Sequence, residues 1–409
     1  MWTLIKIAWR SVWRSKIRSA VVIFAVASGL VGGLFASAWM NGMANQRVQN
    51  TFDYETGHLQ VHNPEFKVNE DVKMTIDSVD WVMERLRAHK QVLAATKRAK
   101  VMGMAATANK NMGVNITGVN PQTERLVFAL ADRIDSASGN FFTEERRNPI
   151  VISKALAKEL NAKLKSKIVL TFQDYHGEIT GAAFKVVGLY KTDNNPWDKR
   201  HVFVMNRDLE RILDLPSNRS HEIAVKLSDF EAAPEVAAQF GKEFPSLTVE
   251  DWAELSPYLR LMSGYMNTMM GLFMGIILGA LGFGIVNTML MVVLERTREL
   301  GMLMAVGMNR RRVFLMIMLE TIFLAMVGAV LGELISVFLI EYYGRSGIDL
   351  SGVSEGMEAV GYSSMTYPLL EPYRYLQITV LVIITAVLAS IYPAVKALRL
   401  HPAEAIRTL

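Results

Sequence analysis

The sequence predicts an α-helical membrane protein with four transmembrane helices and an α+β extracytoplasmic domain inserted between helices 1 and 2. The composition points to a membrane, because 51% of the 409 residues are hydrophobic, 20% are charged and the mean hydropathy is +0.21. Four long runs carry almost no charge. A stretch with a soluble composition, residues 41–260, separates the first run from the second.

The composition also excludes several classes of protein. No cysteine is present, so disulfide scaffolds, cysteine-ligated metal sites and thiol catalysis are ruled out. The formal net charge of +5 does not indicate nucleic-acid binding, because residues 41–260 contain 29 basic and 29 acidic residues. The basic excess lies beside the hydrophobic runs instead.

Each of the four apolar runs is long enough to cross a bilayer. The first, residues 20–40, would extend about 31 Å as a helix at about 1.5 Å per residue, which matches a hydrocarbon core of about 30 Å. The second, residues 261–294, would reach about 51 Å and should project from the membrane as a stalk on the side of residue 260. The third and fourth spans are residues 313–340 and 376–395.

Basic residues in the short connecting segments predict the orientation. Residues 1–19, 295–312 and 396–409 carry five, five and three Lys or Arg, whereas residues 341–375 carry two. Positive charge favours the cytoplasmic side, so both termini and the 295–312 loop are predicted to be cytoplasmic. Residues 41–260 and the short loop 341–375 are then extracytoplasmic.

Residues 1–19 are predicted to form an interfacial helix. Apolar residues recur at helical spacing at Trp2, Ile5, Trp9 and Val12. Basic residues recur on another face at Lys6, Arg10 and Arg14. Such a helix would place its aromatic rings at headgroup level and its cations toward anionic lipid, although an ordinary juxtamembrane anchor explains the same pattern.

Glycines spaced four residues apart predict close helix packing in three of the spans. They are Gly29 and Gly33 in the first span, Gly271, Gly275 and Gly279 in the second, and Gly328 and Gly332 in the third. The spacing does not distinguish packing within one chain from packing across a dimer.

The extracytoplasmic segment mixes helix and strand signals. Residues 80–87 and 153–161 are predicted helices, and residues 149–152, 168–172 and 183–189 are predicted strands. Its six histidines fit no catalytic or metal-binding motif. His58 and His62 lie in an alternating, strand-like pattern that places them about 13 Å apart at roughly 3.3 Å per residue, too far to share one metal ion.

The 295–312 loop is the most informative stretch of the sequence. A charged turn precedes a short Met-rich apolar segment, and three arginines end the loop. An exposed amphipathic segment should lie on the membrane or fill a groove of another protein, and methionine suits an adaptable interface. A partner bound to the 295–312 loop could move the stalk formed by residues 261–294. The chain has no P-loop, since Gly241-Lys242 is followed by Glu243, so a separate ATPase must supply any energy from ATP.

Three stretches of the sequence resemble the FtsX/MacB-type (type VII) ABC transporter permeases. They are ERTRELGMLMAVGMNRRRVFLMIMLE, the closing YPAVKALRLHPAEAIRTL, and PIVISKALAKELNAKL. Met40-Asn41-Gly42 and the later GHLQVHNPEF are most similar to the LolC/LolE branch of that superfamily, the permeases of lipoprotein release.

The resemblance implies a dimer with a second permease, identical or paralogous, bound to two copies of a cytosolic ABC ATPase in a bacterial inner membrane. ATP and Mg²⁺ would bind to the ATPase, and this chain, which is not an enzyme, would bind no cofactor. Movement of the periplasmic domain would push a lipoprotein, or another lipophilic substrate, from the membrane lipid toward a periplasmic carrier. FtsX-like control of an extracytoplasmic hydrolase and MacB-like efflux of another substrate remain alternatives.

The resemblance also places the site of ATPase coupling on the 295–312 loop. The residues predicted to couple to the ATPase are Glu295, Arg298, Glu299, Leu300, Gly301, Met304, Ala305 and Gly307. A candidate substrate cavity is predicted at Trp39, Met40, Met266 and Met270, near the outer ends of the first two spans. No catalytic residue and no metal ligand is predicted.

Two acids interrupt the third span. Glu320 lies about 10 Å into the span from Val313, at about 1.5 Å per residue, and Glu333 about 30 Å in. Acids inside spans are costly and need partners. Glu320 is predicted to be hydrogen-bonded at a packed helix interface near the 295–312 loop, and Glu333 to reach the outer headgroups.

Overall fold

The computed structural model describes residues 2–14, 16–142 and 147–398, which form two compact units. The helical unit contains Met1–Ala44, Ser263–Asp349 and Met365–Leu409. The α+β unit contains Asn45–Met262 together with the segment Leu350–Ser364. The last eleven residues, 399–409, lie outside the described part, so the predicted cytoplasmic tail beyond Leu398 is not described further.

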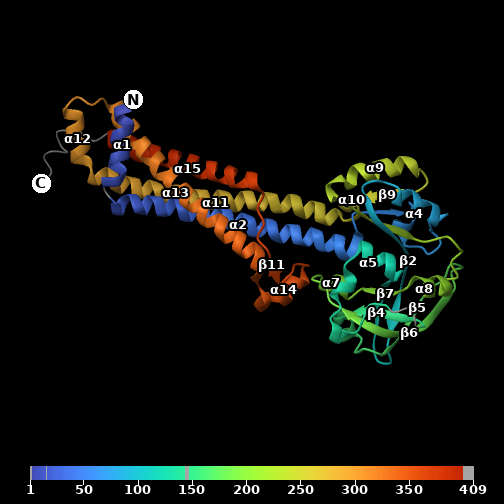
Figure 1. Cartoon of the computed structure of the whole chain (residues 1–409). Helices are drawn as coiled ribbons and strands as arrows, with labels where there is room; N and C mark the ends of the chain where they lie inside the picture. Colours follow the sequence, from blue (N-terminus) through green and yellow to red (C-terminus); the bar gives the residue numbers. More distant parts are fainter. Residues whose placement is uncertain (1, 15, 143–146, 399–409) are drawn as a thin grey trace. The chain divides into compact units, whose positions relative to one another are not determined.

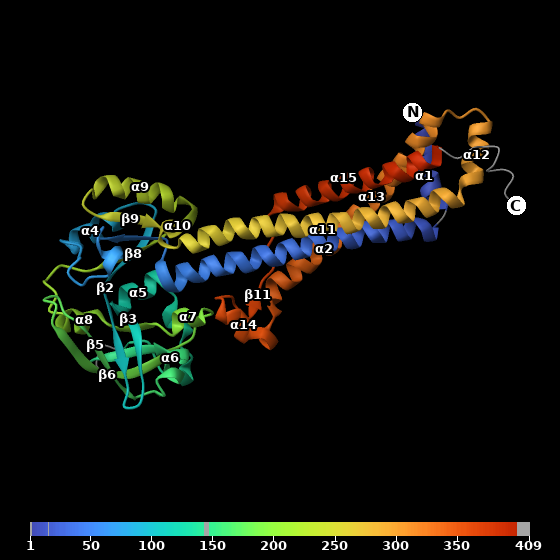
Figure 2. The same ribbon diagram turned by 180° about the vertical axis from the view of Figure 1, so that it is seen from behind.

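The helical unit is built from one short amphipathic helix, four long helices and one connecting helix (Figures 1 and 2). They are α1 (Trp2–Arg14), α2 (Lys16–Thr51), α11 (Pro257–Glu295), α12 (Thr297–Ala305), α13 (Arg310–Ser346) and α15 (Pro372–Leu398). Within the described residues, α2, α11, α13 and α15 are long and apolar enough to cross a membrane, in agreement with the four predicted spans.

The long helices extend beyond the apolar runs that predicted them. Helix α2 continues past Met40 to Thr51, and α11 begins at Pro257 rather than at residue 261. The residues between Met40 and Thr51 are mostly polar but include no proline, so the helix continues through them. Proline at position 257 suits the first turn of a helix, where its missing N–H has no partner to lose.

Helix α1 packs on the helical unit through a face that shares only Val12 with the apolar stripe predicted to lie at the lipid headgroups. Its buried residues are Leu4, Ala8 and Val12, spaced four apart, whereas Trp2 is 78% exposed. Trp9 is 44% exposed and touches the edge of Phe323 in α13 with ring centroids 5.4 Å apart. Small Ala8 allows the close approach of the helix, so the bulky rings are left toward its outer side.

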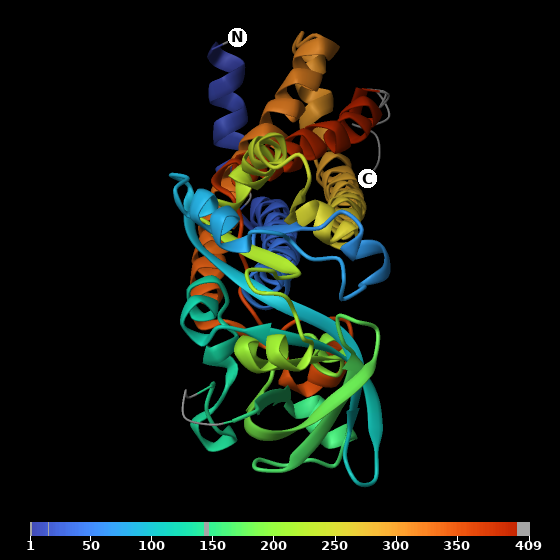
Figure 3. The same cartoon turned by 90° about the vertical axis from the view of Figure 1, so that its right-hand side faces the viewer.

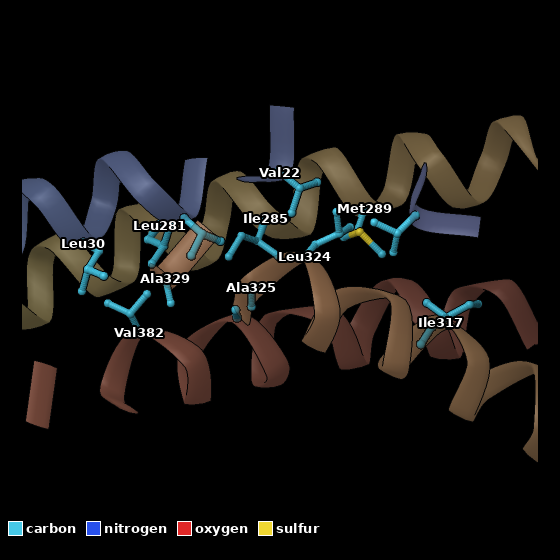
Figure 4. Packing of buried hydrophobic residues seen from close by; sticks show 14 of the residues in the cluster. Val22, Leu30, Leu281, Ile285, Met289, Ile317, Leu324, Ala325, Ala329 and Val382 are labelled. Atoms are coloured by element: carbon cyan, nitrogen blue, oxygen red, sulfur yellow. The ribbon is translucent and has the colours of Figure 1, made fainter. Parts of the chain in front are cut away.

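The core of the helical unit is continuous from α1 to α15. Figure 4 shows side chains of α2, α11, α13 and α15 meeting in this core. The labelled members are Val22, Leu30, Leu281, Ile285, Met289, Ile317, Leu324, Ala325, Ala329 and Val382.

Four of the seven predicted packing glycines lie at close helix contacts within this chain. A Cβ at Gly328 would lie 2.8 Å from Val26 Cβ, and one at Gly332 would lie 2.9 Å from the Ala27 carbonyl oxygen. The corresponding distances are 3.0 Å to Leu281 at Gly29 and 3.4 Å to Met274 at Gly33. The ladder Gly271, Gly275 and Gly279 meets no atom within 4 Å in the described part of the chain.

The α+β unit contains a nine-stranded sheet in the order β3-β7-β4-β6-β5-β2-β8-β1-β9. The strands are β1 (Leu59–His62), β2 (Val92–Ala106), β3 (Asn111–Val119), β4 (Pro149–Ser153), β5 (Lys167–Gln173), β6 (Ile179–Tyr190), β7 (His201–Met205), β8 (Glu222–Leu227) and β9 (Thr248–Asp251). Its helices are α3 (Phe66–Asn69), α4 (Val79–Arg87), α5 (Pro121–Val127), α6 (Lys154–Glu159), α7 (Asn195–Asp198), α8 (Asn206–Ile212), α9 (Ala233–Glu243), α10 (Trp252–Leu255) and α14 (Ser354–Ala359).

The long strand β2 joins two lobes (Figure 3). Its first half, Val92–Arg98, pairs with β8, and its second half pairs with β3 and β5. Because β2 and β3 also pair, strands β3, β7, β4, β6, β5 and β2 close into a six-stranded barrel with its own core. The other lobe packs α4 and α9 against β1 and β8 around Leu59, Ile223 and Phe240.

The predicted elements of this unit are confirmed. Helix α4 covers the predicted 80–87, and β4, β5 and β6 cover the three predicted strands. Ser153 caps α6 by accepting a hydrogen bond from the Leu156 N–H at 2.9 Å, which explains why strand passes directly into helix there. His62 ends strand β1, as the alternating pattern predicted.

Candidate functional site

The short helix α12, between α11 and α13, has one buried side and one exposed side. Leu300 is 2% exposed and Gly301 is buried, and both lie against the helical unit. Met302 and Val306 are 55% and 90% exposed. Gly307 has φ +102°, a left-handed conformation that suits glycine, and lets the chain turn away from α12 before α13 begins.

The exposed side of α12 differs from the predicted contact set. Arg298, Ala305 and Gly307 are exposed as expected for residues that meet a partner. Leu300 and Gly301 fill the core of the helical unit instead, because a two-turn helix beside a bundle must bury its own apolar face. Met302 and Val306 were not predicted, although their spacing of four residues on a helix indicates a shared face.

A chain of ion pairs holds α12 in place. Arg296, which precedes α12, donates through Nη1 to both carboxylate oxygens of Glu320 in α13, at 2.8 and 3.1 Å. Its Nε donates to Glu299 Oε2 at 3.1 Å, and Glu299 Oε1 accepts from Arg14 of α1 at 2.7 Å. The side chains of Glu320 and Arg296 are only 6% and 18% exposed, so this pair lies in a medium of low polarity.

The Arg296–Glu320 pair agrees with the predicted placement of Glu320 at a packed helix interface near the loop. The partner Arg296 was missed by sequence reasoning. The two residues are 24 positions apart, one in the turn between α11 and α12 and the other in α13, so no local periodicity links them. Together, the four residues Arg14, Arg296, Glu299 and Glu320 connect α1, α12 and α13, and we call them the α12 charge network.

A groove of about 610 Å³ lies between α2, α11 and α15. Its lining includes Ser37, Met270, Gly271, Met274, Gly275, Leu278 and, from α15, Tyr373, Arg374 and Ile378. Its position on α11 is about 30 Å from the α12 end, at about 1.5 Å per residue over the residues from Met274 to Glu295. The small Gly271 and Gly275 widen it, and its volume falls in the range of ligand-binding cavities.

Of the residues predicted to line a substrate cavity, Met270 lines this groove. Trp39, Met40 and Met266 are not among its lining residues. Trp39 instead donates from its indole N–H to Thr366 Oγ1 at 3.0 Å, which fixes α2 to the chain that leads into α15. Only one of the four predicted residues lines the groove, because the rotation of α2 about its axis cannot be read from composition.

The α+β unit contains a cleft of about 310 Å³, and its lining includes Arg98, Lys100 and Glu222, which belong to a network of ion pairs. Arg98 of β2 pairs with Glu124 of α5 and, at 3.4 Å, with Glu222 of β8, and their side chains are 4% exposed or less. Lys100 also pairs with Glu222. Burial alone would raise the pKa of Glu222, but Lys100 and Arg98 hold it below its ordinary value of 4.5. The network ties the two lobes together at β2.

Three of the six histidines of the α+β unit are buried residues whose charged form is disfavoured. Burial lowers the pKa of His58, His201 and His221 to about 4 in each case. His221 Nδ1 accepts from the Lys100 N–H at 3.0 Å, and His201 stacks on Trp197. Within the described residues, no group of three or more histidine or acidic side chains could hold a metal ion.

Asp198 makes the stability of the α+β unit depend on pH. Burial raises its pKa from 3.8 to about 7, against hydrogen bonds from the Thr192 N–H and hydroxyl. A carboxyl whose folded pKa is raised makes folding less favourable as the pH increases from about 4 through 7, by roughly 4 kcal/mol at most.

We therefore expect Asp198→Asn to reduce this pH dependence. The amide can still accept from the Thr192 N–H, so its fold should persist, and its Tm at pH 8 should rise by several degrees relative to the native chain. Thermal unfolding of the full-length chain in detergent at pH 5 and pH 8 measures the effect. Exposed Asp132→Asn serves as the control, and an unchanged pH profile in Asp198→Asn would refute the assignment.

Two family models match the chain. The model described as the MacB-like periplasmic core domain matches residues 19–243, more than half of the 409 residues, and the FtsX-like permease C-terminal model matches residues 271–402. The second match includes α12, α13 and α15.

Curated relatives share low identity over most of the chain. The lipoprotein-releasing system transmembrane protein LolE of Haemophilus influenzae is 20% identical over 79% of each chain. The corresponding LolC of Xylella fastidiosa is 23% identical over 71% of this chain and 72% of its own. A macrolide export ATP-binding/permease protein MacB of Bdellovibrio bacteriovorus is 22% identical over 96% of this chain, which spans only 60% of that protein.

One solved structure found by similarity is the periplasmic region of MacB from Actinobacillus actinomycetemcomitans. It has 13% sequence identity and a TM-score of 0.36, and the match covers 53% of this chain and 98% of that one. The family assignment rests on the sequence matches. With both family models in chain order, and four helices able to cross a membrane in the described part of the chain, the chain belongs to the FtsX/MacB-type ABC transporter permeases.

Proposed function

We propose that this permease extracts lipoproteins from the inner membrane toward a periplasmic carrier, driven by a separate cytosolic ABC ATPase. In this proposal two ATPase copies bind to this chain and a second permease, and hydrolysis moves the α+β domain in the periplasm. The relatives named as lipoprotein-releasing proteins support the choice of cargo. The balance of basic residues in the short loops supports the orientation.

The two-sided structure of α12 is the observation that carries the proposal. Its inner side is fixed by Leu300 in the core and by the α12 charge network. Its outer side presents Met302 and Val306, which would be costly to leave in water and suit a hydrophobic groove of a partner. A force applied to α12 would pass directly to α11 and α13, the two long helices that flank it.

The groove between α2, α11 and α15 supports a lipophilic cargo. Its apolar methionine and leucine side chains and two glycines offer a surface for acyl chains. The open ladder Gly271, Gly275 and Gly279 would let another helix, of a second permease, approach α11 closely.

The proposal predicts that the outer side of α12 binds the ATPase. Met302→Glu and Val306→Glu should each reduce the amount of ATPase that copurifies with the chain by at least tenfold, because each places a charge in an apolar contact. The measurement is purification from native membranes in mild detergent, followed by mass spectrometry of the copurifying proteins.

Ile179→Glu is the matched control, because Ile179 is 78% exposed on the α+β unit and should not affect the ATPase. If the native chain brings down no ATPase, or if both α12 variants retain it fully, the proposal is wrong. A copurifying ATPase accompanied by a cell-wall hydrolase or an outer-membrane channel, in place of lipoproteins, would support the FtsX-like or MacB-like alternative.

A further inference from the structure

The segment Leu350–Ser364 belongs to the α+β unit although the chain on both sides of it belongs to the helical unit. It starts and ends at a two-stranded ribbon, in which β10 (Ile348–Asp349) pairs with β11 (Met365–Thr366). The chain therefore enters the α+β unit a second time, through the connection between α13 and α15.

An ion pair attaches this segment to the sheet. Glu358 of α14 pairs with Lys191, which follows β6, at 2.7 Å between Oε1 and Nζ. The Glu358 side chain is only 14% exposed, and α14 packs against α7. The Lys191 side chain is 51% exposed, so the pair lies at the edge of the contact, with its carboxylate largely withdrawn from water.

A second contact attaches the segment to the end of α2. Gly361 has φ +81°, and a Cβ on it would lie 3.0 Å from Arg47 Nε. Arg47 is 9% exposed and donates to Thr51 Oγ1 at 3.1 Å and to Glu55 at 3.2 Å. The guanidinium therefore lies close to Gly361, and glycine is the residue type that permits both the positive φ and this approach.

The same polar cluster continues into the loop after β6. Asn194 donates to Glu55 at 2.8 Å, and Asn50 donates to Asp193 at 3.2 Å. Burial raises the pKa of Tyr362, the nearby Tyr258 at the start of α11 also raises it, and Arg47 lowers it. The segment therefore meets residues from the last turns of α2 and the first turn of α11, the helix ends through which the chain enters and leaves the α+β unit.

We propose that Leu350–Ser364 is a strap that keeps the α13–α15 connection attached to the α+β unit throughout the transport cycle. Glu358, Lys191 and Arg47 act as positioning residues that hold the strap closed. Flexing occurs in the β10–β11 ribbon, which has only two residue pairs. The inference rests on the proposed function in one respect, since it assumes that the α+β unit moves when ATP is hydrolysed.

The first test needs no cargo. The chain has no cysteine, so Lys191→Cys with Glu358→Cys introduces a unique pair of thiols for a short bis-maleimide crosslinker. In native membranes the crosslink should form to the same extent with and without ATP and Mg²⁺. A yield that falls severalfold on adding ATP would show that the strap opens and would overturn the proposal.

The second test measures coupling in the purified complex in liposomes. Glu358→Lys should reduce ATP-driven release of lipoprotein at least tenfold with ATP hydrolysis retained, and Lys191→Glu combined with it should restore release. Crosslinked protein should release lipoprotein within twofold of the native rate. Exposed Glu355→Ala on the same helix controls for the loss of an α14 charge.

Native release in Glu358→Lys, failure of the charge swap to restore it, or loss of release on crosslinking would each overturn the strap. If the native complex itself releases no lipoprotein, the proposed function fails. In that case the crosslinking yield with and without ATP still tests whether the strap stays closed.

Discussion

Replacing Glu320 with alanine is expected to destabilise the helical unit by about 3 to 5 kcal/mol and to displace α12. The substitution leaves Arg296 charged, mostly buried and without its carboxylate partner, which is the costly way to break such a pair. Arg296 also orients Glu299, so the remaining α12 charge network loses its anchor on α13. Protease accessibility of α12 and thermal unfolding of the full chain in detergent measure the two effects.

Three further variants separate the effect of the unpaired Arg296 charge from the effect of losing the Glu320 side chain. Glu320→Gln keeps an acceptor for Arg296 and should lose less stability than Glu320→Ala. The double variant Arg296→Met with Glu320→Met removes both charges and should recover much of the lost stability, because apolar side chains suit the site. Glu333→Gln, in the same helix but outside the network, should change neither readout. Equal losses in Glu320→Ala and Glu333→Gln would contradict the role assigned to the pair.

Replacing Arg98 with methionine is expected to lower the Tm of the α+β unit by roughly 10 °C. The change leaves Glu124 and Glu222 buried without their shared cation, at a cost of about 3 to 5 kcal/mol, and domains of this size lose about 2 to 4 °C per kcal/mol. Loss of the contact between Arg98 and the Phe128 ring, at 3.6 Å, adds to the effect. Thermal unfolding of the full-length chain checks the prediction.

The loss in Arg98→Met should depend on pH in a defined direction. In the native chain the depressed pKa of Glu222 contributes stability above its ordinary value of 4.5, and this contribution disappears as the pH falls through the folded pKa. The difference in Tm between native chain and variant should therefore shrink on acidification. Lys100→Met is the matched control: Lys100 is 31% exposed, so a smaller loss is expected. An equal loss in both variants would contradict the central position of Arg98.

Local patterns predicted the elements of the fold well. The length of an apolar run is a local property, so the four spans, strands β4 to β6 and helix α4 follow from composition and periodicity. Helix ends were less predictable, since α2 continues through polar residues up to Thr51. The apolar stripe of α1 predicted an interfacial helix, but it did not reveal the face Leu4, Ala8 and Val12 that packs on the helical unit, because that packing depends on how closely the small Ala8 can approach.

Contacts between distant parts of the chain could not be predicted in the same way. Arg296 and Glu320 meet because α11, α12 and α13 fold back on one another, and Lys191 meets Glu358 from 167 positions away. Glycine spacing predicted close packing, but only the structure separates Gly328, which contacts α2, from the open Gly275. The inward position of Leu300 likewise depends on where the bundle lies, which the amphipathic pattern of α12 leaves open.

ATP-dependent release of lipoprotein from liposomes tests the proposed function most directly. The complex of this chain with its copurified ATPase would be reconstituted with an acylated lipoprotein and supplied with a soluble periplasmic carrier. The proposal predicts that lipoprotein appears on the carrier only with hydrolysable ATP, and that Met302→Glu abolishes the transfer. Hydrolysis of ATP by the intact complex with no lipoprotein on the carrier would contradict the proposal.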